Sequence, residues 1–316
     1  MVAVTADVIA QASSRVPAVF RESPQFICEP LSARLAVPVI VKVETANPIG
    51  CFKGRGTWLA VSELAANGTV GEERGVVVAS AGNFGQGVAY AGRALGVPVV
   101  VFAARNALAS KVEAMRRLGA DVRLVGEDFD AARDAAAAHA SGAGWELLVD
   151  GADPWIAIGA GSIGSEMTSA IAAGSLPAVG AVFVPVGNGA LVSGIGVWMR
   201  HAAPEVRVIG VQAAGAPAMT LSWRAGRAIE TERVETIADG IAARVPVPEA
   251  LELMLSVVDE MRLVDDDAII AATAEMAAAL PLRIEPSAGA AWAAALQRPA
   301  DGPIALILTG GNVPGG

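Results

Sequence analysis

Short runs of β-branched and aliphatic residues alternate along the chain with longer, alanine-rich stretches, and this alternation constrains the fold more than any other feature. Several runs are apolar at every position, as in strands that a parallel sheet buries on both faces. Strands are predicted at 38–44, 75–80, 97–103, 120–126, 181–187, 206–212 and 303–311. Helices are predicted over Gly56–Asn67, Gly85–Leu95, Ser110–Leu118, Phe129–Ser141, Gly161–Ala173, Leu191–His201 and Asp266–Leu280. The alternation predicts an α/β fold built on an open parallel sheet.

Length and composition limit the classes of protein that the chain can represent. Its 316 residues exceed what one average core serves, which predicts two domains or lobes. Hydrophobic residues make up 53% and charged residues 17%, so the chain can build a large core. The formal charge of −9 and the lack of a basic stretch argue against a nucleic-acid partner.

Few residues of this chain are suited to bind a metal or to form disulfides. Cys28 and Cys51 are too few for a disulfide framework, and His139 and His201 lack the spacing of metal ligands, so no metal is predicted. No apolar run reaches the length of a membrane span, and the first residues lack the layout of a signal peptide. We expect a cytoplasmic protein with reduced thiols that binds no membrane.

Two glycine-rich turns follow predicted strands directly. In "SAGNFGQG" (80–87), Ser80, the turn amides and Asn83 lie where a helix begins, which suits an anion such as a carboxylate, although an ordinary helix cap has the same composition. In "VGNGALVSG" (186–194), the small residues let backbone amides crowd around a phosphate. No Gly-Lys-Ser/Thr follows, which argues against a nucleoside triphosphate. Because ligands gather at the carboxyl ends of parallel strands, both turns are candidate binding sites.

A third glycine-rich segment, "GAGSIG" (159–164), matches the dinucleotide fingerprint. The preceding residues do not form a clean strand, and no acidic residue follows at the expected ~20 residues to hold a ribose. Close helix packing also explains such glycines. A nicotinamide-dependent oxidoreductase therefore stays open as an alternative from another class.

Lys53 stands in the glycine-rich segment "NPIGCFKGRG" (47–56), an unusual place for a lysine. Phe52 would supply apolar surface and Arg55 a positive field, and either would favour the reactive, neutral amine. The glycines would allow a flat group to approach closely. An amine combined with a phosphate turn and a carboxylate turn indicates pyridoxal phosphate, which needs a lysine and a phosphate site.

These motifs resemble, in order, those of the fold type II pyridoxal-phosphate enzymes, and most closely the serine/threonine dehydratases of the tryptophan synthase β-like superfamily. "NPIGCFKGRG" is similar to N-P-T-G-S-F-K-x-R-G, and "SAGNFGQG" is similar to S-x-G-N-H-x-Q-G. "VGNGALVSG" resembles the family's glycine tetrad and leucine, "TIADGIA" (236–242) resembles T-x-A-D-G-x-A, and "LTGGN" (308–312) resembles S-G-G-N. The likeness covers nearly the whole chain.

The resemblance implies a role for each matching residue. Lys53 would be the Schiff-base lysine, with Phe52 and Gly240 on the two faces of the cofactor ring. Asn83 would contact the phenolic oxygen, and Thr309 the pyridine nitrogen. The phosphate would bind the turn made by Gly187, Asn188, Gly189, Ala190 and Leu191. The substrate carboxylate would bind Ser80, Ala81, Gly82 and Asn83.

The same resemblance implies a two-lobed, three-layer αβα fold and a homodimer. The larger, cofactor-binding domain would comprise 1–72 and 151–316, and a smaller mobile domain 73–150. The implied reaction is β-elimination of a 3-hydroxy L-amino acid such as L-threonine or L-serine, which yields a 2-oxo acid and ammonia. A β-replacement or threonine-synthase-like enzyme stays open, as does a non-catalytic binding protein. No C-terminal regulatory domain is expected, because the sequence ends soon after Asn312.

Three departures from the family pattern bear on the reaction. Phe84 replaces the usual histidine, which would reshape the substrate pocket. Ala81 stands where serine racemases carry a second serine, which disfavours racemisation. Gln212 and Ala213 stand where many relatives carry an acidic residue near a cation, so a divalent cation is not expected.

Overall fold

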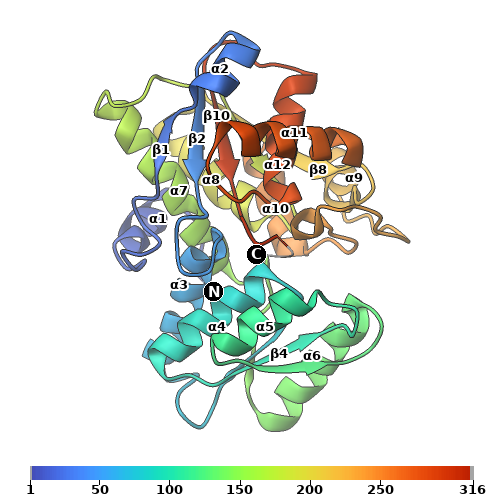
Figure 1. Cartoon of the computed structure of the whole chain (residues 1–316). Coiled ribbons are helices and arrows are strands. Elements are labelled where there is room, and N and C mark those ends of the chain that lie inside the picture. The colour runs from blue at the N-terminus through green and yellow to red at the C-terminus, as the bar shows by residue number, and fades with distance from the viewer. Residues whose placement is uncertain (1, 314–316) are drawn as a thin grey trace.

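The chain forms two open sheets that lie one above the other in the computed structural model, which describes residues 2–313 (Figure 1). The larger sheet has the order β1-β2-β10-β7-β8-β9, with only the β1–β2 pair antiparallel. Its strands are β1 (Gln25–Ile27), β2 (Val39–Val43), β10 (Ile304–Leu308), β7 (Ala181–Pro185), β8 (Arg207–Ala213) and β9 (Glu260–Val264). The smaller, parallel sheet has the order β5 (Asp121–Leu124), β4 (Val99–Ala103), β3 (Val76–Ala79) and β6 (Glu146–Leu147).

Helices cover both faces of both sheets. The N-terminal half carries α1 (Ala6–Ser13), α2 (Glu29–Leu35), α3 (Lys53–Ala66), α4 (Asn83–Leu95), α5 (Ala109–Arg117), α6 (Phe129–Ala143) and α7 (Pro154–Ala172). The C-terminal half carries α8 (Ala190–Ala202), α9 (Ala218–Ala225), the 3-10 turn η1 (Asp239–Ile241), α10 (Pro248–Val257), α11 (Asp266–Ala279) and α12 (Pro286–Gln297). None of the helices in residues 2–313 is both long and apolar enough to cross a lipid bilayer.

The larger sheet is buried on both faces because its strands are apolar at every position. In β10, Leu306 packs toward α11 and α12, whereas the neighbouring Ile307 packs toward α7, α8 and α10. Successive side chains of a strand point to opposite faces, so a continuous apolar run fills two cores. Burying each such side chain contributes about 1.5–3 kcal/mol. The result is the three-layer αβα arrangement that the family resemblance implies.

The smaller sheet is built in the same way. Val78 and Val101 pack with α4 and α5, while Val77 and Val100 pack with α6 on the other face. All its strands lie within the predicted mobile domain, 73–150. The boundaries of that domain, and its mobility, stay predictions.

Every predicted strand and helix forms, but α7 begins seven residues and α3 three residues earlier than predicted, the largest differences among the helix starts. Helix α7 starts at Pro154 instead of Gly161, because the Asp153 carboxylate accepts a hydrogen bond from the Trp155 amide and caps the helix. An aspartate followed by proline is a common start of a helix. Helix α3 starts at Lys53 instead of Gly56.

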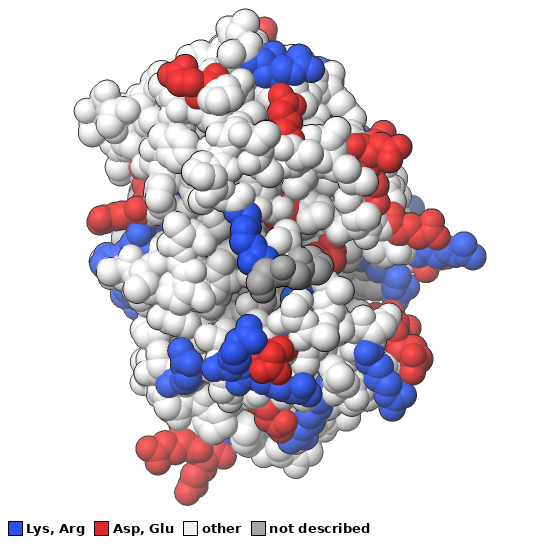
Figure 2. Space-filling view, in the orientation of Figure 1, with Lys and Arg blue, Asp and Glu red and all other residues white. Residues whose placement is uncertain are grey.

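On the face shown in Figure 2, basic and acidic side chains are interspersed, and wide areas carry no charged residue. This distribution follows from a sequence in which only 17% of the residues are charged. Burial therefore takes most of the apolar residues but leaves some at the surface, as in most folded proteins.

Candidate functional site

A cavity of about 1030 Å³ lies between the two sheets, at the carboxyl ends of their strands. It brings together segments that are far apart in the sequence. Of the predicted site residues, those that line it are Phe52, Lys53, Ser80, Ala81, Gly82, Asn83, Gly187, Asn188, Gly189, Leu191, Gly240 and Thr309. Ala190 is the exception, since it is buried as the first residue of α8 and lines a separate, smaller pocket.

The amine of Lys53 enters the cavity from the first turn of α3. Its Nζ donates hydrogen bonds to both carboxylate oxygens of Asp150, at 2.7 and 2.6 Å. The rings of Phe52 and Phe84 lie 4.9 and 5.6 Å from Nζ, measured to their centroids. The side chain is only 11% exposed, so the amine has an aromatic setting and one carboxylate partner. The sequence motifs did not indicate Asp150; its place just after a strand of a parallel sheet is the one available signal.

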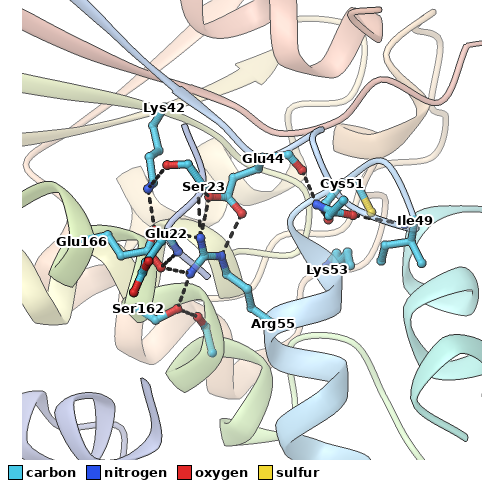
Figure 3. A network of polar contacts seen from close by, with 12 residues as sticks. Glu22, Ser23, Lys42, Glu44, Ile49, Cys51, Lys53, Arg55, Ser162 and Glu166 are labelled. Carbon is cyan, nitrogen blue, oxygen red and sulfur yellow. Dashed lines mark hydrogen bonds and ion pairs between the residues drawn. The ribbon is translucent and has the colours of Figure 1, made fainter. Parts of the chain in front are cut away.

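Arg55 does not supply the positive field that the sequence suggested. Its guanidinium is fully buried, and it donates to Glu44 at 2.8 Å and to Glu166 at 2.6 Å (Figure 3). Lys42 also donates to Glu166, at 2.5 Å, so two cations and two carboxylates balance within the network. The network joins β2 and α7 to the start of α3, and it thereby anchors the turn that carries Lys53.

Burial and the neighbouring charges shift the pKa values of the residues in this network. Burial alone raises the pKa of Glu166, but the hydrogen bonds and charges of Arg55 and Lys42 together outweigh it and hold the pKa below its ordinary value. Burial lowers the pKa of Lys42, and its two carboxylate neighbours offset part of that effect. Burial on its own would lower the pKa of Arg55, but Glu44 and Glu166 raise that pKa overall.

Gly54 and Gly56 serve the packing of α3 and not the approach of a ligand, contrary to the sequence interpretation. A Cβ on Gly54 would lie 2.2 Å from the Phe20 ring, and a Cβ on Gly56 would lie 2.6 Å from the backbone of Ile156 in α7. Such distances are not tolerated, so α3 can pack this closely only with glycine at both positions.

The turn between β3 and α4 is held by its own serine. Ser80 Oγ accepts hydrogen bonds from the amides of Gly82, at 3.2 Å, and Gly85, at 2.9 Å. Its hydroxyl proton stays available for the cavity. Lys111, which the sequence did not indicate, reaches the same turn, and it forms an ion pair with Asp239 on the opposite side of the cavity.

Asn83 is oriented by two neighbours. Its Oδ1 accepts a hydrogen bond from Asn312 at 2.8 Å, and its Nδ2 donates to both oxygens of Glu285 at 3.1 Å. The two oxygens belong to one carboxylate and lie in nearly the same direction from the nitrogen, so one N–H is shared between them and the second N–H stays available for a ligand. Burial raises the pKa of Glu285 to about 7, although Asn83 and Lys111 oppose the shift. The sequence did not indicate Glu285, whose partner is 202 residues away.

The turn between β7 and α8 has the form of an anion site. Gly189 has a φ of +103°, and a Cβ on Gly187 would lie 2.8 Å from the carbonyl oxygen of Gly240, so both positions require glycine. The Ala190 amide donates to Asn188 Oδ1 at 3.4 Å, and the amides that follow it at the helix start, with the positive end of the helix dipole, favour negative charge. Asn188, which stands in the segment that resembles the family's glycine tetrad, uses its side chain instead: Nδ2 donates a hydrogen bond to the backbone oxygen of Asp150 at 2.8 Å.

Two buried hydroxyls face the cavity without a hydrogen-bond partner among the described residues. They are Thr309 Oγ1, at the end of β10, and Ser287 Oγ, in the first turn of α12. An unsatisfied buried hydroxyl costs about 1–3 kcal/mol, so a ligand that bonds to it recovers free energy. The structure thereby marks Ser287 as a further polar group of this site.

The dinucleotide interpretation of "GAGSIG" is wrong. These six residues lie inside α7 and are all buried, so they form no strand-to-helix turn. A Cβ on Gly159 would lie 2.5 Å from the Cα of Gly56, and one on Gly161 would lie 2.5 Å from Ile9. The glycines let α7 pack against α3, α1 and α8.

A metal site is not formed by the side chains that the structure describes: no three His, Cys, Asp or Glu residues gather in residues 2–313. The Oε1 atom of Gln212 accepts hydrogen bonds from the amide and the hydroxyl of Thr220, both at 2.9 Å. Gln212 therefore stabilises the start of α9.

Comparison with known proteins adds to this geometry. A sequence model of the family described as "Pyridoxal-phosphate dependent enzyme" matches residues 19–310. The chain is 37% identical over 278 residues to the L-threonine ammonia-lyase of Thermotoga maritima, which covers 87% of this chain and 67% of that protein. The processed form of threonine deaminase isoform 2 from Solanum lycopersicum has a TM-score of 0.87 at 32% identity, covering 97% of this chain and 89% of that one. Maize serine racemase has a TM-score of 0.90 at 26% identity, covering 98% and 94%.

Proposed function

The chain belongs to the pyridoxal-phosphate-dependent enzyme family, and from that premise we propose that it is an ammonia-lyase. It would convert a 3-hydroxy L-amino acid, such as L-threonine or L-serine, into a 2-oxo acid and ammonia. The observation that carries the proposal is the meeting of three groups in one cavity: the Lys53 amine, the Ser80–Asn83 turn and the Gly187–Leu191 turn.

The residues present fit pyridoxal phosphate. The Gly187–Leu191 turn, at the start of α8, would hold the phosphate. The orphaned Thr309 hydroxyl would bond to the ring nitrogen, and Asn83, which keeps an N–H to spare, would bond to the phenolic oxygen. Phe52 and Gly240 line the cavity and would contact the two ring faces. Lys53 would hold the cofactor covalently.

When bound, pyridoxal phosphate supplies an electron sink for the substrate's α-carbon. The chain's own residues supply the rest. The Ser80–Asn83 turn, at the start of α4, would hold the substrate carboxylate and so fix the α-carbon. Lys53 Nζ, once free, would take the α-proton as a general base. The two rings beside Nζ would shield it from water, and Nζ would return the proton to the departing β-hydroxyl, which leaves as water.

Thr309 bears on which reaction the site favours. Its hydroxyl is neutral, so it does not force a proton onto the ring nitrogen as a carboxylate would. The resulting weaker electron sink suits loss of a β-substituent better than transamination. Ala81 supplies no acid or base at the turn, which argues against the racemisation that the name of the maize relative denotes.

A homodimer and a cytoplasmic location complete the proposal. The dimer rests on the family resemblance. The location rests on Cys28 and Cys51, which are free and buried.

The proposal is tested with the purified protein loaded with pyridoxal phosphate. We expect a visible absorption band, a cofactor label on Lys53 after borohydride reduction, and 2-oxo acid with equimolar ammonia from L-threonine or L-serine. Lys53→Ala should abolish the label and the turnover. Lys53→Arg, which keeps the charge beside Asp150, should fold normally and also lose turnover.

Other products would identify other members of the family. A product that forms only with added sulfide or phosphorylated homoserine would indicate β-replacement or threonine-synthase-like chemistry. Accumulation of D-serine would indicate a racemase. A protein that binds the cofactor on Lys53 but releases no ammonia from any 3-hydroxy amino acid would contradict the proposed reaction.

A further inference from the structure

Asp150 lies against the reactive atom of the site, and neither the motifs nor the comparisons assign it a role. We infer that Asp150 is a catalytic residue: the carboxylate that receives the Lys53 amine whenever that amine is free. The inference rests on the proposed function, because it concerns the lysine that would hold the cofactor. The Lys53 amine would become free each time a substrate takes its place on the cofactor.

The contacts of this pair make Asp150 a dedicated partner of Lys53. Lys53 Nζ donates to Oδ1 and Oδ2 at 2.7 and 2.6 Å, and its other close neighbours are two aromatic rings. Asp150 forms no other ion pair among the described residues. The lysine side chain is 11% exposed and that of Asp150 22%, so water screens the pair only partly.

A second contact holds Asp150 in place from behind. Asn188 Nδ2 donates to the Asp150 backbone oxygen at 2.8 Å. The next residue, Gly151, has a φ of +96°, and a Cβ there would lie 3.1 Å from Asn188 Cγ. Asn188 itself belongs to the turn proposed for the phosphate. The position of the carboxylate is thus tied to that turn, which is not expected of a chance contact between a lysine and the nearest acid.

The pair has a direct consequence for proton abstraction. When Nζ takes the substrate's α-proton, the C–H bond breaks, an N–H bond forms, and the electron pair stays with the substrate. Lys53 thereby becomes positively charged. Asp150 balances that charge at hydrogen-bond distance, and it does so more strongly as the charge develops, which is how a fixed charge accelerates a reaction.

Three variants test the inference. Asp150→Asn keeps the shape but removes the charge, and we expect kcat to fall about 100-fold while KM changes less than about 3-fold. Asp150→Glu keeps the charge and should recover most of the loss. Glu232→Gln is the matched control, because it removes a carboxylate at the exposed rim of the same cavity; it should leave kcat unchanged.

A second measurement uses the cofactor-free protein and needs no turnover. Each lysine is labelled with trace acetic anhydride at pH 7, and the labelled peptides are quantified by mass spectrometry. Only the neutral amine reacts, so Lys53 should be labelled several-fold faster in Asp150→Asn than in the wild type. Lys111 serves as the internal reference, because its partner Asp239 is unchanged.

The outcomes separate this inference from the proposed function. If the wild type carries the cofactor on Lys53 but Asp150→Asn matches it in kcat and in labelling, the inference is wrong and the function stands. If the wild type does not carry the cofactor on Lys53, both fall. If circular dichroism shows that Asp150→Asn does not fold, Asp150→Glu decides. A kcat of Asp150→Glu far below that of Glu232→Gln, with Lys53 labelled at the wild-type rate, would contradict the inference.

Discussion

Glu285 is a carboxyl group that the fold holds almost wholly out of water. It is 3% exposed, accepts hydrogen bonds from Asn83, and is enclosed by Gly310, where a Cβ would lie 2.2 Å from Oε1. Burial raises its pKa from the ordinary 4.5 to about 7. The folded chain therefore binds this proton more tightly than the unfolded chain does.

This shift predicts how stability depends on pH. The contribution of Glu285 to the free energy of unfolding is fully present below pH 4.5 and is lost as pH rises through about 7. The loss is roughly 3 kcal/mol at most. Glu285→Gln cannot ionise, so it should remove this part of the slope. Thermal unfolding of the cofactor-free protein at pH 5, 6 and 7 measures it. A slope that is the same in the variant and the wild type would show that Glu285 is ionised throughout.

The orphaned hydroxyl of Thr309 permits a prediction that changes with the cofactor. Thr309→Val removes an unsatisfied buried hydroxyl, so the cofactor-free variant should be as stable as the wild type or slightly more stable. With pyridoxal phosphate bound, the variant lacks one hydrogen bond, and its cofactor affinity should fall about 10-fold. Melting temperatures with and without cofactor test both statements.

The matched control for Thr309 is Ser193→Ala. Ser193 Oγ is also buried without a partner among the described residues, but it lies outside the main cavity. Its removal should leave cofactor affinity unchanged. Equal effects of the two variants on affinity would argue against a bond between Thr309 and the ring nitrogen.

At the scale of elements, the position of Lys53 depends on helix α3 and its anchor. The guanidinium of Arg55 satisfies Glu44 and Glu166, which are 1% and 16% exposed. Removing the cation from a buried carboxylate strongly destabilises the folded protein, and far more than removing the cation from an exposed carboxylate does. Helix α3 is therefore held to β2 and α7 by charge as well as by packing.

Arg55→Met is predicted to lower the free energy of unfolding by about 3–5 kcal/mol. The control is Arg105→Met, which breaks an exposed pair with Glu127 and should cost less than about 1 kcal/mol. Urea denaturation of the two variants gives the comparison. Equal, small losses would mean that water reaches the Arg55 network.

Prediction of elements from the sequence succeeded where local patterns are strong. The valine-rich run at 75–80 forms β3, and the amphipathic stretch after it forms α4. Helix α12 was missed because it is buried nearly all round, so its sequence lacks the 3.6-residue alternation of a surface helix. The segment around Arg224–Pro248, for which no element was predicted, is largely irregular and contains η1.

At the scale of the whole molecule, two of the ion pairs within residues 2–313 cross the cavity to the irregular segment at 226–247. Lys111 of α5 pairs with Asp239, and Asp130 of α6 pairs with Arg244. Both join the part that carries the smaller sheet to the irregular segment at 226–247. If 73–150 moves as a domain, as the family resemblance implies, these pairs must break and re-form as the cavity opens and closes.

Arg244→Gln is predicted to favour the open cavity. We expect faster hydrogen exchange in 226–247 and a KM several-fold higher, with a smaller change in kcat, because one of the two ties is lost. Arg233→Gln is the control in the same segment, since its side chain is 82% exposed and its contact with Glu235 is long, at 3.9 Å. Exchange that is identical in both variants would speak against a closing role for the pair.

The sequence by itself determined the α/β architecture, the order of the elements and the turns that line the cavity, because these depend on local periodicity and on residues that are near neighbours. Tertiary structure alone decided which polar side chains face each other. Asp150 and Lys53 are 97 residues apart, and Glu285 and Asn83 are 202 apart. No local pattern encodes such a pair: it exists because parallel strands bring their carboxyl ends to one edge of each sheet. Only the burial that results raises the pKa of Glu285.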